Sequence, residues 1–233
     1  MPYIWRTGGI EVPKGEIQFV DVNFGYSGAY DMVLQDINLT IPAGKTTAIV
    51  GATGSGKSTL LKLILQFLGT GFYGSIYIDG VDTREMLPHD LRELISYAPQ
   101  KANIYSGTVE SNLRVAKPEA TPQDIRKACD MAMVTEFLEA KHVSPEFELA
   151  QGGANLSGGQ RQRMSLARAF IKDAFIYLLD DTFSALDFKT DAAVRGAMYR
   201  EMKGTSPNRL KPVRVIDTPM KERFFFFLKE DFQ

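Results

Sequence analysis

The sequence predicts an α/β fold in which a mainly parallel sheet is joined by a small antiparallel β subdomain and an inserted helical subdomain. A glycine-rich loop, Gly-Ala-Thr-Gly-Ser-Gly-Lys-Ser at 51–58, stands between a β-branched run and an apolar helix pattern. The apolar run at 175–179 ends at Asp180 and Asp181, which is typical of a central parallel strand. Residues 101–154 show helical patterns and no clear strand.

The size and composition limit the classes of protein to which the chain can belong. With 233 residues, 44% of them apolar, it can form one large or two small domains. The 27 basic and 28 acidic residues give a net charge of −1, which argues against nucleic acid or an anionic membrane surface as a partner. Cys129 is the single cysteine, so no internal disulfide is possible, and we interpret it as a core thiol. The chain as given lacks an apolar run of about 18 residues and a signal peptide, and is expected to be soluble.

The elements are expected in the following order. Residues 1–15 lack periodicity and contain several Pro and Gly, as a linker does. Strands are expected at 17–22, 33–41, 46–50, 75–78, 95–98 and 175–179, and helices at 60–65, 90–94, 108–115, from Thr121 onward, 131–140, 161–170 and 190–203. Arg161 and Arg163 are interpreted as part of a solvated helix face. From about Ser206 three prolines interrupt the chain and no strand pattern is recognised, so this tail is expected to be poorly ordered or unusually packed. Phe224–Phe227 is either a buried strand or an aggregation-prone segment.

The loop at 51–58 satisfies the pattern G-x-x-x-x-G-K-[ST] and has the flanking strand and helix that the pattern requires. Its glycines allow backbone N–H groups to turn toward a phosphate, and the following helix N-terminus adds partial positive charge. Lys57 would reach the β- and γ-phosphates, and the Ser58 hydroxyl would bind Mg²⁺. The loop therefore predicts a nucleoside triphosphate site; the alternative is a glycine-rich turn without a ligand.

Further residues, taken in order, resemble the nucleotide-binding domain of an ABC transporter over about residues 16–205. Leu156-Ser157-Gly158-Gly159-Gln160 is similar to the family signature. Tyr26 is similar to the aromatic residue that stacks on adenine, Gln100 to the Q-loop glutamine, Asp180 to the Walker B aspartate and Asp187 to the D-loop aspartate. The resemblance implies a P-loop NTPase core that binds ATP and Mg²⁺.

The resemblance also implies a role for each site residue. The nucleotide contacts would come from Tyr26, Gly51, Thr53, Gly54, Ser55, Gly56, Lys57, Ser58, Thr59, Gln100, Ser157, Gly158, Gly159, Gln160 and Asp187. Mg²⁺ would be held by Ser58, Gln100 and Asp180, and catalysis would depend on Asp181, Gln100, Lys57 and Ser157. In this family two domains pack head to tail, so Ser157, Gly158 and Gly159 would cap the γ-phosphate bound by the partner's loop.

Two segments, 104–113 and 148–153, look like the exporter segments that touch the membrane domains. The implied partners are a second nucleotide-binding domain and the transmembrane domains of an exporter, at the cytoplasmic face of the membrane. The expected organisation is a linker at 1–15, the first part of the ATP-binding core at 16–100, a helical subdomain at 101–154, the signature helix and Walker B part of the core at 155–205, and a divergent tail at 206–233.

Two features depart from the family pattern. The position of the general base carries Asp181, one methylene shorter than the glutamate of hydrolytically competent members. The switch histidine expected after Walker B is missing, since His89 and His142 lie upstream. Asp181 together with the intact signature resembles the half of a heterodimeric exporter whose own site is degenerate, and a weak but working base is the alternative.

Two other functions are weighed against a transport ATPase. A nucleotide-gated regulatory module that does not hydrolyse ATP at its own site is favoured by Asp181 and the missing histidine. A soluble ABC protein of nucleic-acid maintenance would carry long coiled-coil or zinc insertions, which the sequence lacks. The sequence leaves the transported substrate open.

Overall fold

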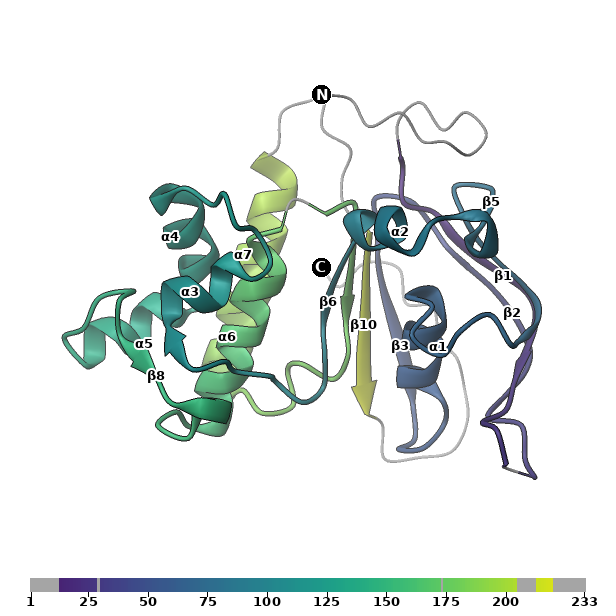
Figure 1. Cartoon of the computed structure of the whole chain (residues 1–233), viewed down its shortest axis with the longest axis horizontal. Coiled ribbons are helices and arrows are strands. Elements are labelled where there is room, and N and C mark those ends of the chain that lie inside the picture. Colours follow the sequence, from purple (N-terminus) through teal and green to yellow (C-terminus); the bar gives the residue numbers. More distant parts are fainter. Residues whose placement is uncertain (1–12, 29, 173, 205–212, 220–233) are drawn as a thin grey trace. The chain divides into compact units, whose positions relative to one another are not determined.

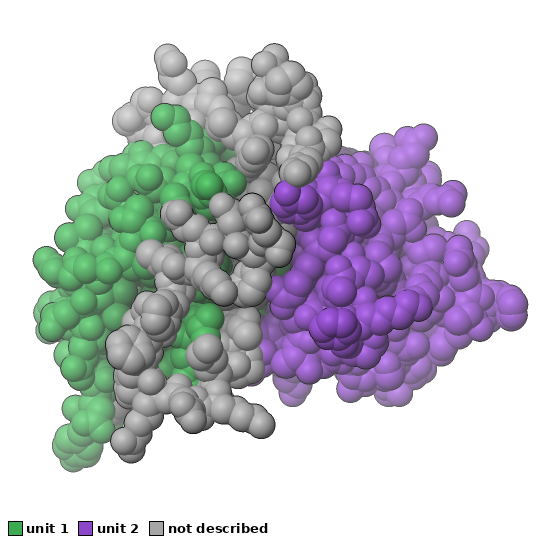
Figure 2. Space-filling model, turned by 180° about the vertical axis from the view of Figure 1, so that it is seen from behind, with its two compact units in different colours: residues 1–96, 174–180, 209–233 green, residues 97–173, 181–208 purple. Residues whose placement is uncertain are grey.

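The computed structural model describes residues 13–28, 30–172, 174–204 and 213–219 (Figure 1). The chain divides into two compact units (Figure 2). The first comprises Met1–Ser96, Ala174–Asp180 and Arg209–Gln233, and the second Tyr97–Asp173 and Asp181–Asn208. The second unit thus joins the helices after residue 97 to the two long helices that follow the signature and the D-loop aspartate.

An antiparallel sheet opens the first unit, with the strand order β2-β1-β4-β5. Its strands are β1 (Ile17–Phe24), β2 (Leu34–Ile41), β4 (Tyr73–Ile78) and β5 (Val81–Asp82). β1 lies in the middle, where Ile17 pairs with both Ile41 and Ile78. Asp79 and Gly80 join β4 to β5 with φ of 51° and 82°, as a two-residue hairpin turn requires. This sheet confirms the predicted antiparallel β subdomain.

The second sheet of this unit has the order β3-β10-β9-β6, formed by β3 (Thr46–Gly51), β10 (Val213–Pro219), β9 (Ile176–Leu179) and β6 (Ile95–Ala98). β10 pairs in parallel with both β3 and β9. The same unit contains α1 (Lys57–Ile64), the 3-10 turn η1 (Thr83–Glu85) and α2 (Pro88–Leu94). Four apolar residues of α1 are completely buried: Leu60, Leu61, Leu63 and Ile64. The predicted mainly parallel sheet next to the glycine-rich loop is confirmed.

β10 corrects the expectation for the tail. No strand pattern was recognised at 213–219, but these residues form an interior strand of the parallel sheet. The prolines do not interrupt it, because Pro212 precedes the strand and Pro219 is its last residue, paired with Gly51. Phe224–Phe227 lies outside the described residues.

The second unit is mainly helical. It contains α3 (Val109–Arg114), α4 (Pro122–Met131), α5 (Val134–Ala140), the 3-10 turn η2 (Gln151–Gly153), α6 (Gly158–Phe170) and α7 (Phe188–Gly204). Thr121 caps α4 by accepting a hydrogen bond from the N–H of Asp124, as its sequence predicts. Cys129 of α4 is 2% exposed, and burial raises the pKa of its thiol to about 12, so its interpretation as a core thiol is confirmed.

Two details of this unit differ from the sequence expectation. A two-stranded ladder joins β7 (Gly107–Thr108) to β8 (Glu148–Leu149) in the region where only helices were expected. Strands of two residues are too short to leave an alternating pattern in the sequence. The helical pattern after residue 131 is also broken, because Met133 adopts φ of 56° between α4 and α5.

Candidate functional site

The glycine-rich loop has the backbone that its sequence predicts. Gly54 and Gly56 have φ of 85° and 88°, which other residues rarely adopt. A Cβ atom on Gly51 would lie 2.8 Å from Ser55 Oγ, so a side chain there would require the Ser55 hydroxyl to move. Thr53 and Gly54 are exposed at the loop tip. α1 begins at Lys57 without a side-chain cap or an acidic residue in its first turn, which favours an anion at this helix N-terminus.

Lys57 is almost completely buried against the loop that precedes it. Its ammonium group donates to the carbonyl oxygens of Gly51 at 3.1 Å and Ala52 at 3.0 Å. Only 8% of the residue is exposed. The ammonium group is therefore held against the backbone of the glycine-rich loop, the segment that the sequence pattern predicts to bind a phosphate.

A hydrogen bond between Ser58 and Asp180 links the glycine-rich loop to the residue that follows β9. The Ser58 hydroxyl donates a hydrogen bond of 2.6 Å to Asp180 Oδ1. Asp180 follows the last residue of β9 and is 2% exposed. A hydroxyl and a carboxylate oxygen are hard ligands of the kind Mg²⁺ prefers, with phosphate oxygens and water completing its shell. Within the described residues, no three or more His, Cys, Asp or Glu side chains cluster so that they could hold a metal ion by themselves.

Tyr26 lies in the connection between β1 and β2. Its hydroxyl shares a hydrogen bond of 3.0 Å with Thr59 Oγ1, in the first turn of α1. Its ring packs edge-on against Phe24, with centroids 5.1 Å apart. The structure thus connects the aromatic residue to the glycine-rich loop, and 41% of Tyr26 stays exposed.

Gln100 and Asp181 meet in the second unit. The side-chain amide of Gln100 donates to Asp181 Oδ2 at 3.2 Å. Asp181 has φ of 46°, a conformation that Asp tolerates better than most residues, and its carbonyl accepts from the Ser184 hydroxyl at 3.0 Å. Two of the three residues that the resemblance assigns to catalysis in this unit, Gln100 and Asp181, are therefore direct neighbours.

The signature segment forms the N-terminus of α6. Ser157 accepts from the N–H of Gln160 at 3.2 Å, while Gln160 Oε1 accepts from the N–H of Ser157 at 2.9 Å, a reciprocal capping box. A Cβ on Gly159 would lie 3.0 Å from the carbonyl oxygen of Ala185, so the helix start packs against the loop that leads to α7. Ser157 and Gly158 are exposed.

Asp187 caps the next helix. Its carboxylate accepts from the N–H of Thr190 at 2.9 Å and from the Thr190 hydroxyl at 2.7 Å. These two hydrogen bonds hold the pKa of Asp187 below its usual value. The predicted D-loop aspartate thus has a local structural role at the start of α7.

Arg161 and Arg163 of α6 do not form the solvated face that was expected. Arg161 donates to the carbonyl oxygen of Leu156 at 2.7 Å and reaches that of Gly153 at 3.3 Å. Arg163 donates to the carbonyl oxygen of Met133 at 3.0 Å and to Glu136 at 3.1 Å. Both guanidinium groups bind backbone oxygens at bends of the chain, which a helical pattern alone cannot reveal.

Sequence reasoning also missed a buried polar network in this unit. Arg168 of α6 donates to the carbonyl oxygens of Asn103 at 2.7 Å and Asn112 at 3.1 Å, and to Asn112 Oδ1 at 2.8 Å. Its guanidinium group lies 4.9 Å from the centre of the Tyr105 ring. Asn112 is 1% exposed and donates in turn to the carbonyl oxygens of Tyr105 and Thr108. An asparagine on the inner face of a short helix is the sequence signal that indicates such a network.

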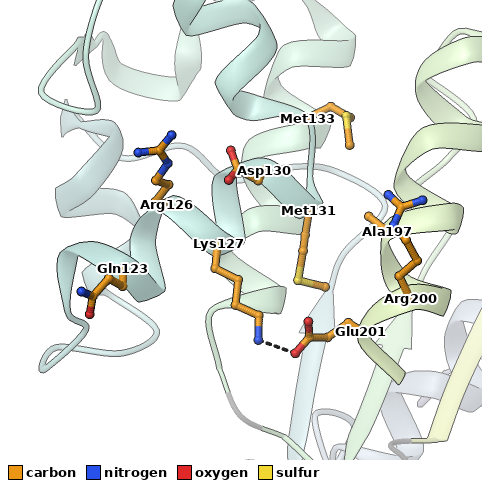
Figure 3. A pocket seen from close by; sticks show the side chains of 9 residues that line it. All are labelled: Gln123, Arg126, Lys127, Asp130, Met131, Met133, Ala197, Arg200 and Glu201. Carbon is orange, nitrogen blue, oxygen red and sulfur yellow. Dashed lines mark hydrogen bonds and ion pairs between the residues drawn. The ribbon is translucent and has the colours of Figure 1, made fainter. Parts of the chain in front are cut away.

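A pocket of about 530 Å³ lies between α4 and α7 of this unit (Figure 3). Lys127 of α4 and Glu201 of α7 form an ion pair across it, and Met131 and Ala197 contribute apolar surface. None of the predicted site residues lines the pocket, so it is separate from the predicted nucleotide site.

Comparisons with known proteins agree with this geometry. Residues 34–184 match the sequence profile of the family described as ABC transporter. The chain belongs to this family. An ABC transporter ATP-binding protein of Mycobacterium tuberculosis is 43% identical over 193 residues, which is 82% of this chain and 32% of the relative. An ATP-dependent lipid A-core flippase of Pectobacterium atrosepticum is 38% identical over 190 residues, covering 81% of this chain and 32% of the relative.

A solved structure of a bacterial Atm1-family ABC exporter with ATP bound superposes with a TM-score of 0.79 at 27% sequence identity. The match covers 88% of this chain and 34% of the exporter chain. This ABC family member thus spans about a third of the length of the relatives it matches. Within the described ranges, none of its helices has the length and apolar character that a membrane crossing needs.

Proposed function

We propose that the chain is the ATP-binding part of an ABC exporter, which binds MgATP, pairs head to tail with a second nucleotide-binding domain and powers transport by ATP hydrolysis. The observation that carries the proposal is the pairing of Ser58 with Asp180 at 2.6 Å, directly after the buried Lys57. A lysine, a hydroxyl and a carboxylate around the N-terminus of α1 are the groups that a magnesium-bound triphosphate requires. The exporter relatives support the assignment, and we place the domain at the cytoplasmic face of the membrane.

Each residue would act on the phosphates or on the attacking water. Lys57 would exchange its carbonyl partners for the β- and γ-phosphate oxygens, and the exposed ring of Tyr26 would stack on adenine. Bound Mg²⁺ would neutralise charge on the phosphates. Ser58 and Asp180 would hold that ion, with the Gln100 carbonyl oxygen as a further ligand. At the N-terminus of α6, the Ser157 hydroxyl and the backbone N–H groups of Gly158 and Gly159 would donate hydrogen bonds to the γ-phosphate of the partner's nucleotide.

The chain's own site is proposed to hydrolyse ATP slowly. Asp181 is shorter than glutamate, and a misplacement of about 1 Å can lower a rate on the order of a hundredfold. Its carboxylate also accepts a hydrogen bond from the Gln100 amide at 3.2 Å, which restricts the orientation of the carboxylate. The signature is intact, so this subunit would complete the active site of a partner that has glutamate at the equivalent position. A nucleotide-gated module that holds ATP without hydrolysing it is the second candidate, favoured by the same Asp181.

The first test is nucleotide binding by the purified chain, measured by calorimetry with MgATP. We expect binding that Lys57→Ala abolishes and very slow turnover. Lys62→Ala removes a lysine from the other end of α1 and serves as the control, with unchanged affinity. Absence of MgATP binding by the unaltered chain would refute the proposed function, and fast ATP hydrolysis by the isolated chain would refute the degenerate site.

The second test separates the two sites of a reconstituted heterodimer. Ser157→Ala should lower ATP turnover far more than Asp181→Ala does, because loss of one preorganised hydrogen-bond donor costs on the order of a hundredfold. If the two substitutions reduce turnover equally, the asymmetric arrangement is wrong and two weak, equal sites take its place.

A further inference from the structure

A backbone hydrogen bond joins the two ends of the connection between β1 and β2. The N–H of Val33 donates to the carbonyl oxygen of Phe24 at 2.8 Å, where the two strands meet. A Cβ atom on Gly25 would lie 3.2 Å from the Met32 sulfur, so the turn packs tightly just before Tyr26. The position of Tyr26 is thus set by a short, closed loop.

The base of this loop packs directly on the glycine-rich loop. A Cβ atom on Gly56 would lie 2.8 Å from Leu34 Cδ2 and 3.1 Å from the carbonyl oxygen of Val33. This approach is possible because residue 56 lacks a side chain. The connection that carries Tyr26 and the loop that binds the phosphates are therefore in contact at their bases.

A second contact links the connection at Tyr26 to the first turn of α1, which follows the glycine-rich loop. The Tyr26 hydroxyl bonds to Thr59 Oγ1 at 3.0 Å, and Thr59 is 7% exposed, so the bond lies at the edge of the core. The Phe24 ring meets the Tyr26 ring at 80° and packs against it. The Tyr26 side chain is held at its hydroxyl and by Phe24, while 41% of the residue remains accessible.

We infer that Thr59 is a positioning residue that acts through Tyr26 and presets the distance between the nucleoside-stacking ring and the phosphate site. The inference rests on the proposed function. In a free loop, the ring would be ordered only when the nucleotide binds, and that ordering would reduce affinity. The Tyr26–Thr59 hydrogen bond orders the ring beforehand. Its contribution to affinity should appear only with ligands that have a base, because a triphosphate alone does not contact the ring.

The test compares MgATP with inorganic triphosphate plus Mg²⁺ as probes of the purified chain. Tyr26→Phe keeps the ring and removes the hydroxyl, and should weaken MgATP binding about two- to tenfold, as expected for one hydrogen bond, while triphosphate affinity stays the same. Thr59→Val should weaken MgATP binding at least as much, and Thr59→Ser should retain it. Tyr26→Phe should cause no further loss in the Thr59→Val background.

Tyr30→Phe is the matched control, because Tyr30 belongs to the same connection, is fully exposed and should leave MgATP affinity unchanged. The inference is overturned if Tyr26→Phe binds MgATP as the unaltered chain does, weakens both probes equally, or causes the same loss with and without Thr59→Val. These outcomes differ from failure of the proposed function, in which the unaltered chain would not bind MgATP.

Discussion

Two glycines of the nucleotide loop have the same backbone conformation but different surroundings. Gly54 and Gly56 both have positive φ, near 85°. Open space surrounds Gly54, whereas a Cβ on Gly56 would meet Leu34 at 2.8 Å. Both positions thus require a residue that tolerates positive φ. Only position 56 also requires a residue without a side chain.

We therefore expect Gly54→Ala to cost about 1 kcal/mol of stability from backbone strain. Gly56→Ala should cost at least about 1 kcal/mol more, since Leu34 must move and overpacking adds to the strain. Urea unfolding of both variants measures the difference. Equal losses would show that a Cβ atom at residue 56 fits beside Leu34 without a steric cost.

At the scale of elements, Arg168 links α6 to α3 and to the chain segment that leads into α3. The guanidinium group makes three hydrogen bonds to Asn103 and Asn112 and stacks on Tyr105. Arg168→Met should lower the free energy of unfolding by about 3 kcal/mol, because buried oxygens lose a charged donor. Arg168→Lys should retain only part of the stability that Arg168→Met loses, since one ammonium group cannot reach all three oxygens.

Arg126→Met is the control for this prediction, since Arg126 is exposed on α4 and its replacement should change stability by less than about 0.5 kcal/mol. Denaturant unfolding of the three variants provides the measurement. A loss for Arg168→Met no larger than that for Arg126→Met would show that the network does not hold α6.

The capping box of α4 predicts a dependence on pH. The N–H of Thr121 and the ammonium group of Lys117 hold the pKa of Asp124 below its ordinary value of 3.8. A carboxylate with a lowered folded-state pKa stabilises the protein above the unfolded value, and this contribution disappears as the pH falls through the folded value. Asp124→Asn should therefore lower Tm at pH 6, and the difference should shrink toward pH 3.

Glu119→Gln, an exposed neighbour, controls for the loss of one negative charge and should leave Tm nearly unchanged at both pH values. If the difference in Tm between Asp124→Asn and the unaltered chain stays constant from pH 6 to pH 3, ionisation of Asp124 does not stabilise the protein and the prediction is wrong.

For the whole molecule, β10 determines whether the parallel sheet is continuous. It lies between β3 and β9, and its register joins Thr46–Gly51 on one side to Ile176–Leu179 on the other. A chain ending at Gly204 should be insoluble or unfold at a much lower temperature, because both neighbouring strands lose their hydrogen-bond partner. Replacing 213–219 by a Gly-Ser segment of equal length should have the same effect, which separates the strand from chain length. Retention of the original Tm in either variant would contradict this role.

Much of the nucleotide site follows from local pattern. The strand, turn and helix around 51–58 are contiguous, so periodicity and glycine spacing predict them directly. Three site contacts join residues far apart in the chain: Tyr26 with Thr59, Ser58 with Asp180, and Gln100 with Asp181. The resemblance assigned each residue a role, but no spacing predicts that Tyr26 and Thr59 share a hydrogen bond.

The sequence by itself determined the glycine-rich loop, the buried strand before Asp180 and the capped start of α4, because each depends on neighbours within a few residues. Only the tertiary structure decided the break at Met133, where the carbonyl oxygen is bound by Arg163 from another helix. It also decided the interior position of β10, whose short, charge-containing sequence becomes a central strand once β3 and β9 lie on both sides of it. Long-range hydrogen bonds override weak local preferences, and such bonds have no periodic signature in the sequence.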